Sequence, residues 1–251
     1  MLLTIDVGNT SITGAVFNGH TIVRRSVLAT PEKWSARYFS ALLPVALAQR
    51  TTAVIIASVV PAIDRDLAAN IKKVIGKRPL FLDHRTATGI TLKIDRPSEL
   101  GADRIADSAG ALTLFSPPLI VIDSGTATTF DLLNARGEYC GGCIFPGLGM
   151  AIESLAENTA KLKKIKFQVP RSPVGTNTAA SIRAGVYFGY IGTLQHLIAC
   201  YRKILGPKSK VVATGGLSRY FKGRIQGIDR FVPDLIFLGL KSIFDRQNPG
   251  P

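Results

Sequence analysis

The sequence predicts an α/β fold made of two related halves, in which mixed sheets are flanked by helices. The first observation is a weak internal repeat that aligns residues 2–10 (LLTIDVGNT) with residues 119–127 (LIVIDSGTA). The second is a hairpin pattern in each copy, because an apolar strand, an Asp-x-Gly turn and another strand pattern follow one another. The third is the alternation of strand and helix patterns after each hairpin. We therefore expect two domains, residues 1–115 and 119–251, joined near Ser116-Pro117-Pro118.

Each further element of the first half has its own signal. A continuous apolar run at Ala53–Ala57 predicts a buried strand. Apolar residues at helical spacing follow Pro61 and predict a helix that ends at Gly76. The remaining predicted elements are the strand within residues 2–10, a strand at Ile12–Phe17 closed by Asn18-Gly19, a strand at Leu80–Leu82 and a helix at Arg104–Leu114.

The second half repeats this order with a longer helix. Thr128–Leu133 has a strand pattern and ends at a glycine-containing turn, Asn134–Gly137. A long helix is predicted over Ser181–Leu205, with three glycines that allow close packing. The last predicted strand, Val211–Ala213, leads directly into Thr214-Gly215-Gly216.

Composition restricts the class of protein. The formal net charge is +14, and its one dense cluster comprises Lys161, Lys163, Lys164 and Lys166. Because other Lys and Arg residues are scattered, a solvated basic face is favoured over a specific nucleic-acid site. No apolar run reaches the roughly 18 residues of a membrane-spanning helix, and the N-terminus lacks a signal-peptide pattern. We expect a soluble protein of the cytoplasm with no membrane partner.

The cysteines and histidines give no metal or redox signal. Cys140 and Cys143 match C-x-x-C, but no second ligand pair accompanies them, so we interpret the match as structural chance. An odd total of three cysteines argues against a disulfide scaffold. The histidines show no ligand spacing and are interpreted as structural or surface residues; they are His20, His84 and His196.

The two Asp-x-Gly turns are candidate phosphate sites. A glycine lets backbone N–H groups approach a phosphate closely, and a carboxylate at the strand end can hold Mg²⁺ directly or through water. The alternative is a tight hairpin with a capping aspartate, but two equivalent copies favour phosphate binding. The residues in these roles are Asp6, Gly8, Asn9 and Thr10 in the first turn and Asp123, Gly125 and Thr126 in the second.

The residues alone leave a second motif ambiguous. Asp103, in Gly101-Ala102-Asp103-Arg104, is either a first-turn acid favoured by the helix dipole or a base for a substrate hydroxyl. Arg104 can hold a substrate carboxylate in a bidentate fork. Thr214-Gly215-Gly216 is a weak candidate for contact with the adenosine part of a nucleotide. No G-x-x-x-x-G-K-[ST] motif is present in the sequence, which excludes P-loop chemistry.

Together these motifs resemble the type III pantothenate kinases, which belong to the superfamily of acetate kinase, sugar kinases, Hsp70 and actin. The motifs occur in family order and cover almost the whole chain. The matching stretches are Asp6–Thr10, Ala57–Pro61, Gly101–Arg104, Asp123–Thr129, Gly141–Gly147, Gly175–Thr178 and Ala213–Gly216. The combination of GADR with D-x-GTATT is specific to that family.

The resemblance implies a duplicated ribonuclease H-like (actin-like ATPase) fold and a homodimer that phosphorylates pantothenate with ATP, the first step of coenzyme A biosynthesis. It implies Asp103 as general base, Asp6 as a Mg²⁺ residue and Asp123 as the residue for a monovalent cation, K⁺ or NH₄⁺. ATP phosphates would lie against Asp6, Val7, Gly8, Asn9, Thr10, Ser11, Ile12, Thr13 and Thr126. Pantothenate would lie against Gly101, Ala102, Asp103 and Arg104, with Thr178 of a neighbouring subunit.

This chain departs from the family pattern at three places. Ile94 replaces a substrate-side tyrosine, Asp107 replaces an asparagine, and Arg183-Ala184 stands where Gln-Ser is common before Gly185. Two alternatives therefore stay open: a related superfamily kinase that acts on another hydroxy acid, and a non-catalytic regulator of the Bvg accessory factor kind. The absence of a recognisable nucleic-acid-binding motif and the presence of both Asp-x-Gly turns favour the enzyme.

Overall fold

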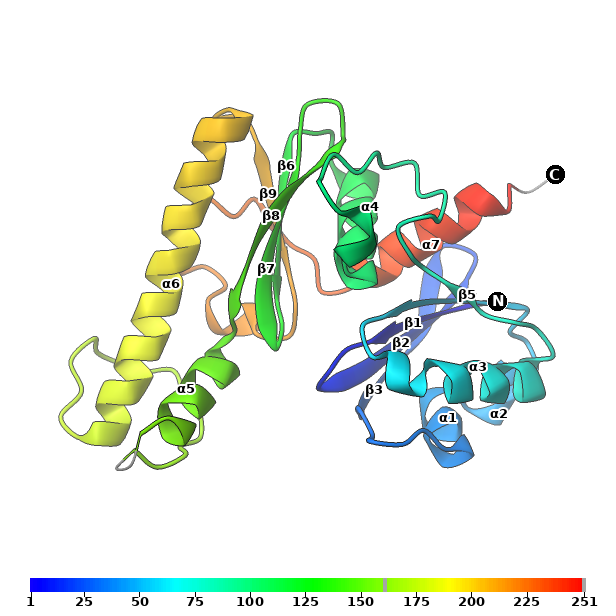
Figure 1. Cartoon of the computed structure of the whole chain (residues 1–251), viewed down its shortest axis with the longest axis horizontal. Helices are drawn as coiled ribbons and strands as arrows, with labels where there is room; N and C mark the ends of the chain where they lie inside the picture. The colour runs from blue at the N-terminus through cyan, green and yellow to red at the C-terminus, as the bar shows by residue number, and fades with distance from the viewer. Residues whose placement is uncertain (160–161, 250–251) are drawn as a thin grey trace. The chain divides into compact units, whose positions relative to one another are not determined.

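The computed structural model describes residues 1–159 and 162–249 of the chain. The chain divides into two compact units (Figure 1). The first comprises residues 1–114 together with the C-terminal segment that begins at Asp234, and the second comprises residues 115–233. Each unit contains one five-stranded mixed sheet. Among the described residues, no helix is both long enough and apolar enough to cross a lipid bilayer.

The sheet of the first unit is centred on its first strand. Its strands are β1 (Leu2–Val7), β2 (Ser11–Asn18), β3 (Thr21–Ala29), β4 (Ala53–Ser58) and β5 (Leu80–Phe81). The strand order is β3-β2-β1-β4-β5, with β1 antiparallel to β2 and parallel to β4. Successive residues of β1 and β4 point to opposite faces, so Ile56 joins one buried cluster and Ile55 the other.

Helices cover both faces of this sheet. They are α1 (Ala36–Leu42), α2 (Val45–Ala48), α3 (Pro61–Ile75), the 3₁₀ helix η1 (Pro97–Glu99), α4 (Ala102–Leu114) and α7 (Leu235–Gln247). Helix α3 begins at a proline, which suits the first helical position, and ends at Gly76 in the left-handed conformation (φ 77°). Its buried side chains pack with one cluster, whereas those of α4 and α7 pack with the other.

The second unit repeats the topology of the first. Its strands are β6 (Leu119–Ser124), β7 (Ala127–Leu133), β8 (Tyr139–Pro146), β9 (Lys210–Thr214) and β10 (Arg230–Phe231). The strand order β8-β7-β6-β9-β10 matches β3-β2-β1-β4-β5 strand for strand, including which pairs are parallel. Its helices are α5 (Leu148–Glu157), α6 (Thr178–Leu205) and the 3₁₀ helix η2 (Ser218–Tyr220). The predicted repeat is therefore a structural repeat.

The C-terminal boundary differs from the sequence expectation, because the predicted second domain of residues 119–251 included α7. Helix α7 instead belongs to the first unit. Its residues Phe237, Leu240 and Ile243 are buried in the cluster that contains α4 and the first sheet. Asp234, before the helix, also accepts two hydrogen bonds of 2.7 Å from Arg25 of β3. No local pattern in the sequence predicts that α7 packs against the first unit.

The cysteines and the basic cluster match expectation where the structure describes them. The cysteines at 140, 143 and 200 are free thiols. Lys163, Lys164 and Lys166 are exposed, and Lys164 forms an ion pair of 2.7 Å with Glu153. Lys161 lies outside the described residues.

Helices α4 and α7 approach so closely that glycine is required at their contact. A Cβ atom added at Gly239 would collide with the carbonyl oxygen of Ala106, and one added at Gly110 would collide with that of Leu235. By contrast, a Cβ added at Gly185, on α6, would have no heavy atom within 4 Å.

We predict that Gly239→Ala lowers the free energy of unfolding by about 1–3 kcal/mol, because the helices must move apart to accept the methyl group. The matched variant Gly185→Ala should instead raise stability by up to about 1 kcal/mol, because alanine is the better helix former. Urea unfolding followed by circular dichroism measures both. Equal effects of the two variants would contradict the close packing of α4 on α7.

Candidate functional site

The first Asp-x-Gly turn follows the central strand of the first sheet. Asp6 is the penultimate residue of β1 and lies opposite Thr13 of β2, whose hydroxyl donates to the Asp6 carboxylate at 3.3 Å. The N–H of Gly8 donates to the carbonyl of Ser11 at 3.0 Å and closes the turn. Asn9 and Thr10 are exposed at its tip. The turn therefore presents polar groups directly beyond a carboxylate whose backbone is fixed between β2 and β4.

Thr30 holds this turn from the side and was not found from the sequence. Its hydroxyl donates to the carbonyl of Gly8 at 2.6 Å, and its N–H donates to the carbonyl of Thr10 at 3.1 Å. Because both carbonyl groups accept hydrogen bonds from Thr30, one conformation of the turn is favoured. Thr30 directly follows β3, and no local pattern distinguishes it from any other threonine after a strand.

The GADR motif lies beside the ends of β1 and β4. Val59, directly after β4, donates its N–H to the carbonyl of Val7 at 3.0 Å. A Cβ placed on Gly101 would lie 3.7 Å from Cγ1 of Val59. The same Cβ would collide with the carboxylate of Asp103, so only glycine leaves room for that carboxylate. The structure thus brings the predicted base to the edge of the sheet where the phosphate turn lies.

Asp103 is held in the first turn of α4 in a poorly solvated place. Burial raises the pKa of its carboxyl above the ordinary range, although the Arg104 N–H, which donates to it at 2.8 Å, and the Arg104 charge oppose the shift. A carboxylate with a raised pKa is a better proton acceptor than a fully solvated one. Asp103 is therefore both an acid in the first turn of a helix and a group that can accept a proton.

The second Asp-x-Gly turn is closed in the same way and packed more tightly. The N–H of Gly125 donates to the carbonyl of Ala127, and the N–H of Gly147 donates to that of Thr126. A Cβ on Gly147 would collide with the Thr126 carbonyl oxygen. Gly215 has a left-handed backbone (φ 89°), and a Cβ there would collide with the Asp123 carboxylate. The predicted nucleotide motif Thr214-Gly215-Gly216 therefore lies against Asp123, the predicted cation residue.

Tyr190 supports the second turn from α6. Its hydroxyl lies 2.6 Å from the hydroxyl of Thr128, and both side chains are buried. Burial raises the pKa of Tyr190, the hydrogen bond with Thr128 opposes this rise, and the charge of Asp123 adds to it. Sequence reasoning missed Tyr190, because its contact spans more than sixty positions of the chain.

Thr178 lies at the start of α6, and the two predicted metal residues, Asp6 and Asp123, lie near the ends of β1 and β6. Thr178 is exposed at the start of α6, after Asn177, whose side chain accepts a hydrogen bond of 2.9 Å from the Ala180 N–H. Thr178 belongs to the second unit, whereas Gly101–Arg104 belongs to the first. Within residues 1–159 and 162–249, no three His, Cys, Asp or Glu side chains gather as metal ligands. Within these residues, neither predicted metal residue therefore belongs to a cluster of three such ligands.

Comparison with known proteins gives the family. A sequence model for type III pantothenate kinase matches residues 2–200. The chain is 37% identical to the type III pantothenate kinase of Moorella thermoacetica, and the match covers 98% of this chain and 100% of the relative. It is 38% identical to that of Phenylobacterium zucineum, with 98% of each covered.

The chain belongs to the type III pantothenate kinase family.

Solved structures agree on the fold of this family member. A protein from Sinorhizobium meliloti, assigned as a 2-dehydro-3-deoxygalactonokinase, matches with a TM-score of 0.64 at 16% identity over 100% of both chains. A protein from Campylobacter jejuni, assigned to the Baf family of transcriptional activators, matches with a TM-score of 0.62 at 19% identity over 98% of both chains. Such distant likenesses show the fold alone. The predicted duplicated ribonuclease H-like fold is confirmed.

The raised pKa of Asp103 predicts how stability depends on pH. The folded state binds this proton more tightly than the unfolded state, so the contribution of Asp103 to stability falls as pH rises from about 4 through the raised pKa. The Asp103→Asn variant has no ionisable carboxyl at this position, so it does not lose this stability as pH rises. Urea unfolding at a series of pH values should show the variant gaining stability relative to wild type across that interval. A stability difference that does not change with pH would contradict the burial of the charge.

Proposed function

We propose that this family member transfers the γ-phosphoryl group of ATP to pantothenate and forms 4′-phosphopantothenate, the first step of coenzyme A biosynthesis. The observation that carries the proposal is the position of Asp103. Its carboxylate lies on the N-terminal turn of α4, beside the ends of β1 and β4, in a chain that matches pantothenate kinases along almost its whole length. The GADR motif thus has a chemical use in addition to its structural one.

The phosphates of ATP bind to the two closed turns. Their residues are Asp6, Val7, Gly8, Asn9, Thr10, Ser11, Ile12 and Thr13 in the first turn and Thr126 in the second. Polar groups at the tip of the first turn supply donors to phosphate oxygens. Because Thr30 fixes the turn beforehand, little ordering remains to be done when the nucleotide binds.

Single carboxylates suit the cations of this reaction. Mg²⁺ is usually held by one or two carboxylates together with substrate phosphates and water, so Asp6 would hold it, directly or through water. Asp123 would hold a monovalent cation, K⁺ or NH₄⁺, because a carboxylate oxygen is a suitable hard donor beside Gly215. Bound in these places, the cations neutralise charge on the triphosphate.

Phosphoryl transfer then needs a positioned alcohol and a proton acceptor. The hydroxyl oxygen of pantothenate forms a bond to the γ-phosphorus, the bond from that phosphorus to the oxygen of ADP breaks, and the hydroxyl proton passes to the Asp103 carboxylate. Arg104 holds the carboxylate of pantothenate in a bidentate fork and so fixes the position of the hydroxyl. Gly101 and Ala102 contact the substrate through their backbone.

We also propose an oligomeric state and a cellular compartment for this enzyme. The enzyme is a homodimer in which Thr178 of one subunit contacts the pantothenate held by the other. It acts in the cytoplasm on its two small-molecule substrates, without a membrane or a specific nucleic-acid partner.

A second candidate substrate is another hydroxy acid, since Ile94 stands where relatives have a tyrosine on the substrate side. A panel of hydroxy acids assayed for ADP release distinguishes the two, and pantothenate should give the highest kcat/KM.

We predict that Asp103→Asn lowers kcat by about 10²–10⁴-fold, the usual contribution of a general base, while ATP affinity changes little. Arg104→Ala should mainly raise the KM for pantothenate, because it removes an anchor of the ground state. Steady-state kinetics and calorimetric titration with a nonhydrolysable ATP analogue separate these effects. An Asp103→Asn enzyme with wild-type kcat, or one that has lost ATP instead of turnover, would move the base to another carboxylate.

We predict pantothenate-dependent release of ADP from ATP in K⁺ or NH₄⁺, and little release in Na⁺ alone. Asp123→Ala should remove this dependence together with most of the ATP affinity, since the cation would lose its carboxylate. Assays at constant ionic strength in each salt provide the measurement. Full activity in Na⁺, or an Asp123→Ala variant that still responds to K⁺, would count against the cation site while leaving the assignment of Asp103 intact.

A further inference from the structure

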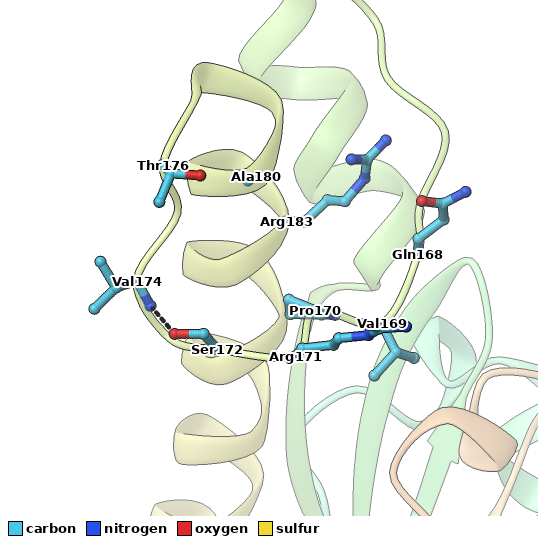
Figure 2. A pocket seen from close by; sticks show the side chains of 9 residues that line it. All are labelled: Gln168, Val169, Pro170, Arg171, Ser172, Val174, Thr176, Ala180 and Arg183. Carbon is cyan, nitrogen blue, oxygen red and sulfur yellow. Dashed lines mark hydrogen bonds between the residues drawn. The ribbon is translucent and has the colours of Figure 1, made fainter.

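A pocket in the second unit is lined by none of the residues assigned to the proposed reaction. It has a volume of about 320 Å³ and lies between the segment after Phe167 and the first turns of α6 (Figure 2). Pockets that hold small molecules measure roughly 300–1,000 Å³, so this one is of a suitable size. Thr178 is not among its lining residues, although Thr176 and Ala180 on either side of it are.

Five of the nine side chains that line the pocket can donate hydrogen bonds. Arg171 lines the pocket from the segment before α6, and Arg183 lines it from α6 itself (Figure 2). Gln168, Ser172 and Thr176 add an amide and two hydroxyl groups. None of the lining residues carries a carboxylate. Guanidinium groups match phosphate and carboxylate oxygens with paired N–H donors, so this lining favours an anion.

The chain segment that forms the pocket contains basic residues but no acidic ones. No Asp or Glu occurs between Glu157 and Asp229, an interval that contains both arginines. Other cations of this interval do have acidic partners beyond its ends: Lys164 pairs with Glu153, and Lys210 pairs with Asp229. Within the described part of the chain, Arg171 and Arg183 are in no ion pair. Their charge is therefore available to a ligand.

Two groups of the pocket are already oriented. Nε of Arg183 donates to the carbonyl of Lys166 at 3.1 Å, which fixes the guanidinium and leaves its terminal N–H groups for other acceptors. The hydroxyl oxygen of Ser172 accepts from the N–H of Val174 at 3.0 Å, so its proton is free to point elsewhere (Figure 2). A site whose donors are held in place before binding loses less freedom when the ligand arrives.

We propose that this pocket binds a small anion with two negatively charged groups, of phosphate or carboxylate chemistry, one group at each arginine. The proposal does not depend on which substrate is phosphorylated.

Isothermal titration of the full chain with pyrophosphate, inorganic phosphate and citrate tests the proposal. Pyrophosphate and citrate offer two or more charged groups, whereas inorganic phosphate offers one, and citrate separates carboxylate from phosphate recognition. Arg183→Gln and Arg171→Gln should each weaken binding of the preferred two-headed probe at least about tenfold, as expected for loss of a charge-assisted pair. Inorganic phosphate should bind more weakly than that probe.

Arg224→Gln is the matched control, because Arg224 is exposed in the same unit, outside the pocket, and its removal changes the net charge equally. It should leave the affinity unchanged. An equal loss in all three variants would indicate diffuse attraction to a basic surface and overturn the proposal. Binding that both pocket variants retain would belong to the phosphate turns and would also overturn it, as would the absence of binding by every probe. Circular dichroism confirms that each variant is folded, and Arg171, on an exposed segment, tolerates replacement without loss of packing.

Discussion

Each unit of this protein depends on one constraint: its central strand must have an aspartate at its penultimate position and then end in a tight turn. The central strand is paired on both sides, so the backbone of Asp6 in β1 or of Asp123 in β6 has no freedom to move. The carboxylate and the turn beyond it are the parts that can meet a ligand. The surrounding structure acts to hold them, through Thr30 at the first turn and through Gly147 and Gly215 at the second.

The two units share one topology but differ in the residues that surround their turns. Both sheets have the same strand order and the same pattern of parallel and antiparallel pairs. The first unit adds α4, which brings Asp103 to the end of the central strands, whereas the second adds Gly215 and Tyr190 around its turn. In the proposed reaction, the first turn lies beside the proton acceptor, and the second turn holds a cation and phosphate.

The sequence predicted those features that local patterns encode. The repeat, both hairpins and the long helix have signals in consecutive residues, and the structure confirms them. Long-range packing has no such signal: α7 was expected with the second half, yet its apolar face completes the first core through contacts with residues more than a hundred positions away. Thr30 and Tyr190 were missed for the same reason, since each acts on a turn that is distant in sequence. Asp103 was found as a residue, but its burial and raised pKa follow only from its neighbours.

The central claim is that the chain places one phosphoryl group on the hydroxyl of pantothenate. The most direct test is to identify the product formed from ATP and pantothenate in K⁺, by mass spectrometry together with phosphorus NMR. The account predicts a gain of one phosphoryl group and a phosphate monoester signal coupled to the CH₂ that bears the primary hydroxyl, with the carboxylate unmodified. ADP formed without a phosphorylated pantothenate, or a phosphoryl group found on the carboxylate, would contradict it.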